Sequence, residues 1–151
     1  MVPGTLRPIA HVLSELELDL GANVSVSPSS ARAALLELQV ADDYWLHFQN
    51  NVEIDGGFSI DVINFIYVDR NCTVTIKAES GNFDEDGVTF IMSMPAATLE
   101  LKSGWNMVSG KVSTEMDLSI PTVTITIEFS VVSTLPSDGK WVLDEVESEY
   151  W

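Results

Sequence analysis

The chain has 151 residues, enough for one domain with its own core, and 46% of them are hydrophobic, which excludes a disordered chain. Aspartate and glutamate number 23 against 7 lysines and arginines, so the formal net charge is −16. A charge of that size opposes binding to nucleic acid and docking on anionic lipid. The single Cys72 excludes an internal disulfide, and no cysteine and histidine spacing indicates zinc.

The start of the chain shows no apolar run of the length that a signal peptide has. The longest mostly apolar stretches span about eight residues, far below the roughly 20 that cross a bilayer. We therefore expect a protein that is made in the cytoplasm and does not contact a membrane.

Alternation of apolar and polar residues, the pattern of a half-buried strand, recurs along the chain. It is present at 16–20, 24–26, 73–79 and 122–130. β-Branched residues fill most of the last segment, which favours a pleated surface. Further strands are expected at 44–48, 58–68, 88–94, 98–102, 111–119 and 140–146.

Turn residues with glycine separate these segments at 55–57, 80–82, 86–87, 103–104 and 137–139. Many short strands at such spacing predict an all-β fold, a mostly antiparallel β-sandwich or partly closed barrel with at most one or two short helices. We expect a single β domain over residues 1–151. Within it, residues 1–15 are expected to form an extended arm and residues 147–151 a flexible acidic tail.

The segment 29–41 has two interpretations. Ala31, Ala34, Leu35 and Leu38 recur at helical spacing behind a possible cap at 27–30. The same stretch also alternates apolar and polar residues from position 36 to position 40, as a strand would. Alanine, leucine and glutamate are good helix formers, so we favour a short helix here.

Two acidic clusters are candidates for a metal site. Asp84-Glu85-Asp86-Gly87 places carboxylates beside a glycine, but the full spacing of a calcium-binding loop is absent. Asp42-Asp43 has His47 nearby but no second histidine. We therefore expect a solvated acidic turn at 84–87 and no bound metal or other cofactor.

No catalytic constellation is present in the sequence. The motifs of serine hydrolases, β-lactamases and zinc proteases do not occur, and Cys72 has no evident base, which favours a buried structural thiol. With 23 acids, some pair of carboxylates will always look suitable for glycosidase chemistry, so such a pair indicates nothing. We expect that the protein is not an enzyme.

The tryptophans leave a binding module as the alternative. Trp45, Trp105, Trp141 and Trp151 could stack on sugar rings, as in a secreted or cell-surface β-sandwich that binds a glycan or protein ligand. Tryptophan in a small β-protein is more often a core or interface residue.

The sequence from 88 to 132 contains a strand that ends in an apolar-proline step, a short strand, a glycine-bearing loop and a long closing strand. Its central part reads VTFIMSMPAATLEL and then KSGWNMVSG, and an upstream stretch at 48–54 reads FQNNVEI. These segments, about half the chain, resemble the tail tube proteins of long-tailed bacteriophages.

The resemblance implies a structural protein of a virion, without catalytic activity or cofactor, that is made in the host cytoplasm. Subunits of that family close into rings, and the rings stack into a tube that carries DNA. The implied partners are further copies of the chain and other virion proteins, and DNA passes only as cargo. A strongly acidic wall would repel phosphate and let DNA slide. Adaptation to high salt also explains the acid excess and remains compatible with this function.

The resemblance also implies where self-assembly occurs. In that family a long hairpin makes much of the contact between subunits, and the matching stretch here is 98–119. We expect Trp105 at the hairpin tip, and an ordinary core hairpin remains the alternative. The apolar residues expected to carry self-assembly are Leu99, Leu101, Trp105, Met107, Val108 and Met116.

Overall fold

The computed structural model describes residues 3–14, 24–41 and 44–145. Strand accounts for 69% of the structure and helix for 4%, in one large mixed sheet and one small sheet that do not form a closed barrel. The prediction of an all-β fold with at most one or two short helices is confirmed.

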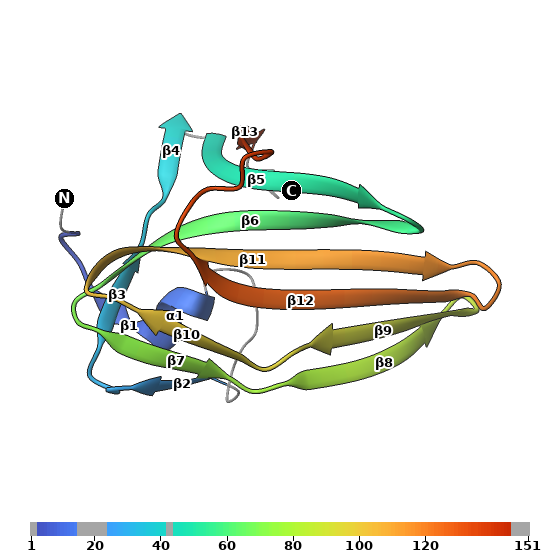
Figure 1. The fold of residues 1–151 in the computed structure, drawn as a ribbon, viewed down its shortest axis with the longest axis horizontal. Helices are drawn as coiled ribbons and strands as arrows, with labels where there is room; N and C mark the ends of the chain where they lie inside the picture. Colours follow the sequence, from blue (N-terminus) through green and yellow to red (C-terminus); the bar gives the residue numbers. More distant parts are fainter. Residues whose placement is uncertain (1–2, 15–23, 42–43, 146–151) are drawn as a thin grey trace, which may run out of the picture.

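The large sheet has ten strands. They are β1 (Arg7–Pro8), β3 (Arg32–Leu35), β4 (Leu38–Ala41), β5 (Tyr44–Ile54), β6 (Gly57–Val68), β8 (Glu79–Glu85), β9 (Val88–Met94), β11 (Gly104–Asp117), β12 (Thr122–Val132) and β13 (Lys140–Glu145). The main path runs β1-β3-β6-β11-β12-β9-β8, with β5 beside β6 and both β4 and β13 beside β5 (Figure 1). All neighbours are antiparallel except β12 and β9, which run parallel.

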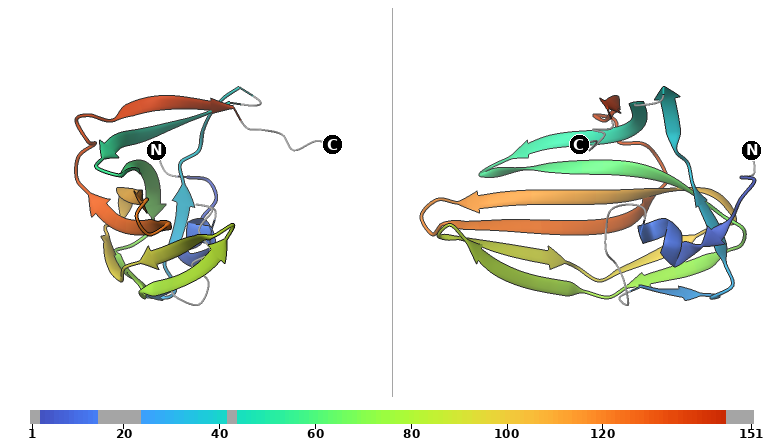
Figure 2. Two further views of the ribbon diagram at one scale, coloured as in Figure 1. Left: turned by 90° about the vertical axis from the view of Figure 1, so that its right-hand side faces the viewer. Right: turned by 180° about the vertical axis from the view of Figure 1, so that it is seen from behind.

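The small sheet has three strands in the order β10-β7-β2. They are β2 (Val24–Ser27), β7 (Cys72–Ile76) and β10 (Ala97–Leu101), and the short helix α1 (Ile9–Ser14) lies beside them. Together these elements cover one face of the large sheet at only one of its ends (Figure 2). We call this covered face of the large sheet its core face and the opposite face its outer face.

The core lies between the two sheets and the helix. On β7, Cys72, Val74 and Ile76 are buried while Thr75 between them is exposed, which is the alternation that the sequence predicts. The largest fully buried side chains of the whole structure are Ile9, Val12, Ile66, Val68, Val74, Ile76, Leu99 and Val108.

Tight turns connect the long strands of the large sheet at the end away from the core. Gly56 between β5 and β6 has φ 79°, and Asp86 and Gly87 between β8 and β9 have φ 51° and 80°. At 86–87 both central residues have positive φ, which is the geometry that two-residue hairpins prefer and that glycine and aspartate tolerate best. The turns predicted at 55–57 and 86–87 are confirmed.

The stretch 98–119 is not a hairpin, contrary to the prediction. β10 pairs with β7 in the small sheet, whereas β11 pairs with β6 and β12 in the large one. The buried side chain of Asn106 shapes the corner between them: its Oδ1 accepts from the Lys102 N–H at 2.9 Å, and its Nδ2 donates to the Lys102 carbonyl at 2.8 Å. Trp105 therefore lies at the start of β11, not at a hairpin tip.

The expected helix at 29–41 is also wrong, because this segment forms β3 and β4. β3 joins the edge of β6, where Ala33 pairs with Val68 and both side chains are buried. These tertiary contacts outweigh a small difference in helix propensity. The helix lies instead within 1–15, where an extended arm was expected, and it buries Ile9, Val12 and Leu13.

Two further expectations have different outcomes. The turn predicted at 80–82 is wrong, because these residues belong to β8, which pairs with β9 along its whole length. The strand expected at 16–20 and the tail expected at 147–151 lie outside the described residues.

The covering layer is much shorter than the sheet it covers. β11 has 14 residues, or about 46 Å at about 3.3 Å per residue, whereas β7 has 5 residues, or about 17 Å. The large sheet consequently has two different halves. We call the covered end, with the β6–β7 and β10–β11 connections, the proximal end, and the end with the three hairpin tips the distal end (left and right in Figure 1).

The close approach of β6 to β11 at Gly57 allows a stability test. A Cβ at Gly57 would lie 1.8 Å from the Thr114 carbonyl oxygen, whereas one at Gly81 meets nothing within 4 Å. We expect Gly57→Ala to lower the free energy of unfolding by about 1–3 kcal/mol, since backbone must move to relieve the overlap. Gly81→Ala should change it by less than about 0.5 kcal/mol. Urea denaturation followed by tryptophan fluorescence measures both, and equal effects would contradict the close packing.

Candidate assembly surface

The core face continues beyond its cover as an apolar surface. Val108 and Phe129 belong to the core, and the residues at every second position along β11 and β12 toward the distal end share their face. The register of β6, β9 and β8 extends this surface across five strands. We call it the distal apolar face; it comprises Phe58, Ile60, Val62, Phe83, Phe90, Met92, Val112, Met116, Val123 and Ile125.

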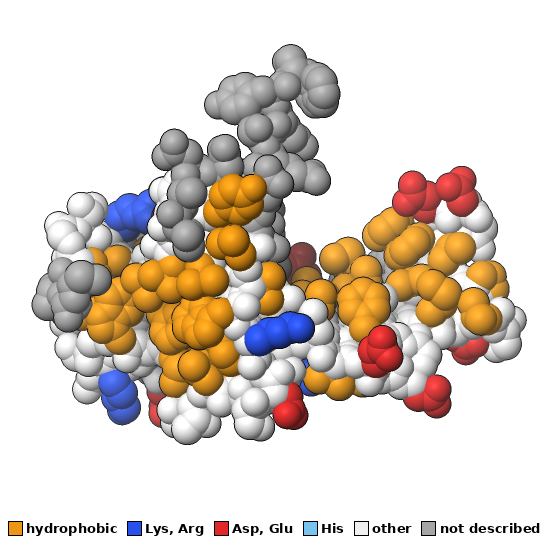
Figure 3. Space-filling model, turned by 90° about the horizontal axis from the view of Figure 1, so that it is seen from above, with side chains coloured by type: hydrophobic (Ala, Val, Ile, Leu, Met, Phe, Trp, Pro, Cys, Tyr) orange, Lys and Arg blue, Asp and Glu red, His pale blue; other side chains and the backbone are white. Residues whose placement is uncertain are grey.

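Several of these side chains are open to solvent. Phe58 is 49% exposed, Phe83 47% and Met92 40%, although each shares the face that buries the core. The rings of Phe83 and Phe90 stack with centroids 5.0 Å apart, so the aromatic part of the surface is ordered. Figure 3 shows hydrophobic side chains gathered at this end, with acidic side chains at their border.

The outer face of the same distal strands is polar. Serine, threonine and acidic residues occupy most of the alternate positions on β6, β11, β12 and β9. The distal half is therefore a single layer of sheet with one apolar face and one face that is mostly hydrophilic, although the latter also carries exposed Val52 and Ile91. The hydrophilic face comprises Ser59, Asp61, Thr89, Ser113, Glu115, Thr124, Thr126 and Glu128, with Lys111 as its one basic residue in the described structure.

The distal sheet also has two open edges. β8 ends the strand order, and within the described ranges only β9 pairs with it. On the side away from β6, β5 pairs with β13 at residues 44–49, but in the described chain residues 50–54 pair with β6 alone. Open edges present unpaired N–H and C=O groups that can bind another strand.

The three hairpin tips contain no lysine or arginine within residues 51–60, 82–92 and 113–125. We call these tips the acidic tips, because they carry seven acids: Glu53, Asp55, Asp84, Glu85, Asp86, Glu115 and Asp117. The tips lie together, since the Met116 N–H donates to the Gly56 carbonyl at 2.9 Å. Asp117 Oδ1 accepts from the hydroxyl and the N–H of Ser119, at 2.6 and 3.0 Å, and these bonds lower the pKa of that carboxyl. Asp117 is therefore ionised at neutral pH, and its carboxylate holds its own turn in shape.

A second exposed apolar surface lies on the outer face at the proximal end (left in Figure 3). Trp105, 38% exposed, meets the Tyr67 ring edge-to-face at 5.5 Å. Trp141, 46% exposed, stacks on Phe65 at 6.1 Å and meets Phe48 edge-to-face at 5.4 Å. These rings are fixed by one another, which is typical of a preorganised contact surface.

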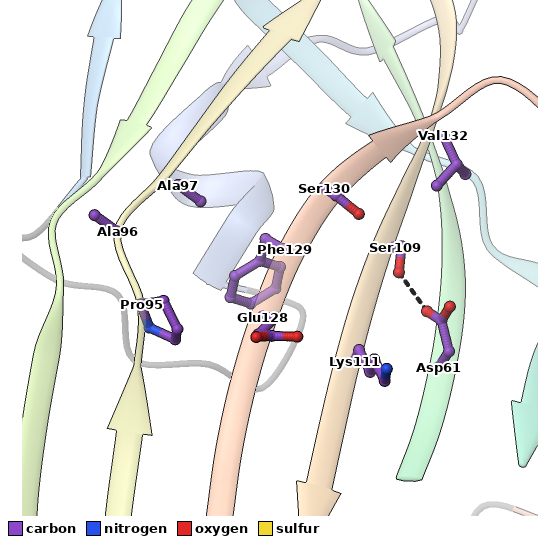
Figure 4. A pocket seen from close by; sticks show the side chains of 10 residues that line it. All are labelled: Asp61, Pro95, Ala96, Ala97, Ser109, Lys111, Glu128, Phe129, Ser130 and Val132. Carbon is purple, nitrogen blue, oxygen red and sulfur yellow. Dashed lines mark hydrogen bonds between the residues drawn. The ribbon is translucent and has the colours of Figure 1, made fainter. Parts of the chain in front are cut away.

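A shallow hollow of about 350 Å³ lies near the middle of β12 (Figure 4). Lys111 stands directly opposite Asp61 on one neighbouring strand and Glu128 on the other, and the Ser109 hydroxyl donates to Asp61. Opposite charges at facing positions stabilise a sheet by roughly 0.2–1 kcal/mol. This row explains how the outer face tolerates three charged side chains side by side.

The structure divides the six residues predicted for self-assembly. Leu99, Leu101 and Val108 are at most 2% exposed and form the core of the subunit, so their assignment to a contact surface is wrong. Trp105 and Met107 share the proximal outer face, and Met116 belongs to the distal apolar face. The structure therefore does not bring the six together.

No catalytic or metal-binding arrangement is evident in the described structure. Cys72 is buried, as predicted, and burial together with the charge of Asp69 raises the pKa of its thiol, which disfavours the reactive thiolate. In the described ranges, no three histidine, cysteine or acidic side chains gather closely enough to hold a metal ion. Asp42 and Asp43 lie outside those ranges.

In the described part of the chain, no helix has the length and hydrophobicity that crossing a bilayer requires. No protein-family model, curated protein or solved structure matches the chain. Function is therefore inferred from the geometry and chemistry of the surface itself.

Sequence reasoning missed most of the distal apolar face. Phe58, Ile60 and Val62 alternate with polar residues just as core strands do, so the pattern indicates one apolar face without showing whether anything covers it. The available signal was the length of the segments, because 57–68 and 122–132 are much longer than 72–76.

The same leucine-to-alanine substitution at two positions distinguishes a core residue from a surface residue. We expect Leu99→Ala to lower the free energy of unfolding by about 2–5 kcal/mol, because Leu99 is fully buried. Leu118→Ala, at a side chain 85% exposed, should change it by less than about 0.5 kcal/mol. Urea denaturation at a concentration where the chain is monomeric measures both. A large loss from Leu118→Ala would show that this residue belongs to the fold.

Proposed function

We propose that the protein is a structural subunit of a virion, a tail tube protein that self-assembles into stacked rings enclosing a conduit for DNA. The observation that carries the proposal is the distal half of the large sheet, a single layer with an uncovered apolar face and two open edges. Such a half-sheet is completed by another chain rather than by its own.

The apolar face supports a macromolecular partner. Its ten side chains span five adjacent strands, and soluble monomers rarely expose apolar patches of more than a few hundred Å². Covering the face would remove the large exposed fractions of Phe58, Phe83 and Met92 from water. That burial supplies the main driving force for association.

The two edges support a ring as the form of that association. β8 and residues 50–54 of β5 are different surfaces at opposite sides of the distal sheet, so contact between them is heterologous. A heterologous contact repeated by rotation closes into a ring when the rotation divides a full turn. Closure then pairs every distal edge, as a barrel does.

The hydrophilic face supports a conduit for DNA. When a neighbour covers the distal apolar face, the serine, threonine and acidic residues of the opposite face remain against water. Acidic side chains repel phosphate, and hydroxyl groups are uncharged, so DNA would pass such a wall without adhering. The partners of the chain are then its own copies and other virion proteins, and its location is the virion.

The alternative, a secreted or cell-surface module that binds a glycan, has less support. A sugar platform needs an aromatic face that is open to the ligand. Trp141 stacks on Phe65, and Trp105 meets Tyr67 at 71°, so each ring keeps less than half of its surface open, a smaller area than the distal apolar face offers. Trp151 lies outside the described residues.

A charge on the apolar face tests the proposal. We expect the unmodified chain to form rings and tubes in negative-stain electron micrographs. Met92→Lys should leave a folded monomer in sedimentation velocity, because assembly would bury an unpaired ammonium group. Thr124→Lys introduces the same charge on the hydrophilic face of the adjacent strand β12 and should still assemble.

Three results would contradict the proposal. The unmodified chain could remain a monomer at high concentration, or Met92→Lys could assemble as well as the unmodified chain. A strict monomer that binds a glycan array would favour the alternative function.

A further inference from the structure

Charge is segregated along the long axis of the molecule. The acidic tips hold seven carboxylates at the distal end. The proximal end holds Arg7, Arg32, Arg70 and Lys102 against Asp69 and Glu100 among the described residues. In the described part of the chain the two ends therefore have opposite sign, although the chain as a whole is strongly acidic.

Asp69 holds part of the proximal end in place. Its carboxylate forms a salt bridge to Arg70 at 2.9 Å, with the Arg70 side chain half exposed, and accepts from the backbone N–H of Arg32 at 2.9 Å. The Ser103 N–H donates to Asn71 Oδ1 at 2.8 Å, which ties the β10–β11 connection to the β6–β7 connection. The basic end is therefore a fixed surface built from β3 and two connected turns.

The distal end adds apolar anchors to its charge. Leu118 and Ile120, in the turn between β11 and β12, are 85% and 67% exposed, the two most exposed large hydrophobic side chains in the described structure. They share a hollow at the tip with Asp55, Glu115 and Asp117. Exposed aliphatic side chains on an ordered turn are typical of residues that insert into a partner.

The proximal end offers a matching acceptor. Trp105 lies three residues from Lys102, at the corner where β11 begins, and its ring is fixed against Tyr67. An exposed aromatic ring beside a cation suits an aliphatic side chain flanked by carboxylates. The two ends face opposite directions along the strands (Figure 1). A second copy displaced along the long axis would therefore place its proximal end against the distal end of the first copy.

We infer that the β11–β12 tip of one subunit docks on the proximal end of a second copy in the next ring, with Leu118 and Ile120 against Trp105 and the acidic tips against Arg32, Arg70 and Lys102. This contact rests on the proposed function and specifies how its rings stack. It is heterologous and directed along the strands, so it adds rings in one orientation and gives the tube a polarity.

A second copy fits the tip better than other partners do. Anionic lipid and nucleic acid would both be repelled by seven carboxylates without a neighbouring cation. The proximal end has the opposite sign and belongs to every copy of the chain. Complementary charge also disfavours tip-to-tip contact, since like charges brought together at an interface are unfavourable.

Charge reversal tests the contact. A tip variant carries Glu53→Lys, Asp55→Lys, Glu85→Lys and Glu115→Lys, which turns the tips from net negative to net positive. A base variant carries Arg32→Glu and Lys102→Glu, which turns the described charges of the proximal end from net positive to net negative. These side chains are exposed, and the substitutions leave the Asp69–Arg70 salt bridge and the Asp117 turn unaltered. We expect each variant to form single rings that do not stack, because attraction becomes repulsion at every junction.

The chain that carries all six substitutions should recover tubes of the original length, because its ends are again opposite in sign. A matched control, Lys77→Glu with Lys140→Glu, makes the same change in net charge as the base variant at exposed positions away from both ends, and it should stack normally. Negative-stain micrographs give tube lengths, and sedimentation velocity separates single rings from stacks.

The outcomes separate this contact from the proposed function. Rings that stack normally in the tip or base variant, or a sixfold variant that fails to recover stacking, overturn the contact and leave ring formation intact. An unmodified chain that forms no rings overturns the proposed function and the contact together.

Discussion

The structure depends on a mismatch of length between two layers. Strands of 11–14 residues in the large sheet are covered by strands of 4–5 residues and a six-residue helix, so the cover ends about halfway along. The same face that buries Val108 and Phe129 at one end exposes Phe58 and Met92 at the other. The proximal half therefore holds the core, and the distal half has an apolar face without a cover in the described structure, which is the face that the proposed self-assembly would bury.

This division assigns different roles to chemically similar residues. Leu99 is part of the fold because a second sheet lies over it, whereas Leu118, the same residue type, extends from a turn into solvent. The hairpin turns at Gly56 and Gly87 keep the distal strands in register without a core of their own. Charge follows the same axis, since the acids gather at those turns and the arginines gather beside the core.

The sequence predicts the strands well and their environment poorly. Alternation locates β6, β7, β9 and β12 closely, because a period of two reflects a sheet with one apolar face. It misses β8, where Gly81 resembles a turn, and it favours a helix at 29–41, where pairing of Ala33 with Val68 prevails. It also assigns Leu99, Leu101 and Val108 to an interface, because alternation cannot show which apolar face receives a cover. That cover comes from segments distant in sequence, β2, β7, β10 and α1.

Amide hydrogen exchange on β8 tests the central claim most directly. The comparison is between the assembled protein and the Met92→Lys monomer, with α1 and β7 as internal references. The account predicts that amides of residues 79–85 that point away from β9 exchange slowly in the assembly and rapidly in the monomer, because assembly pairs that edge. Exchange at the same rate in both states would contradict the claim that the open distal sheet is completed by a neighbouring copy.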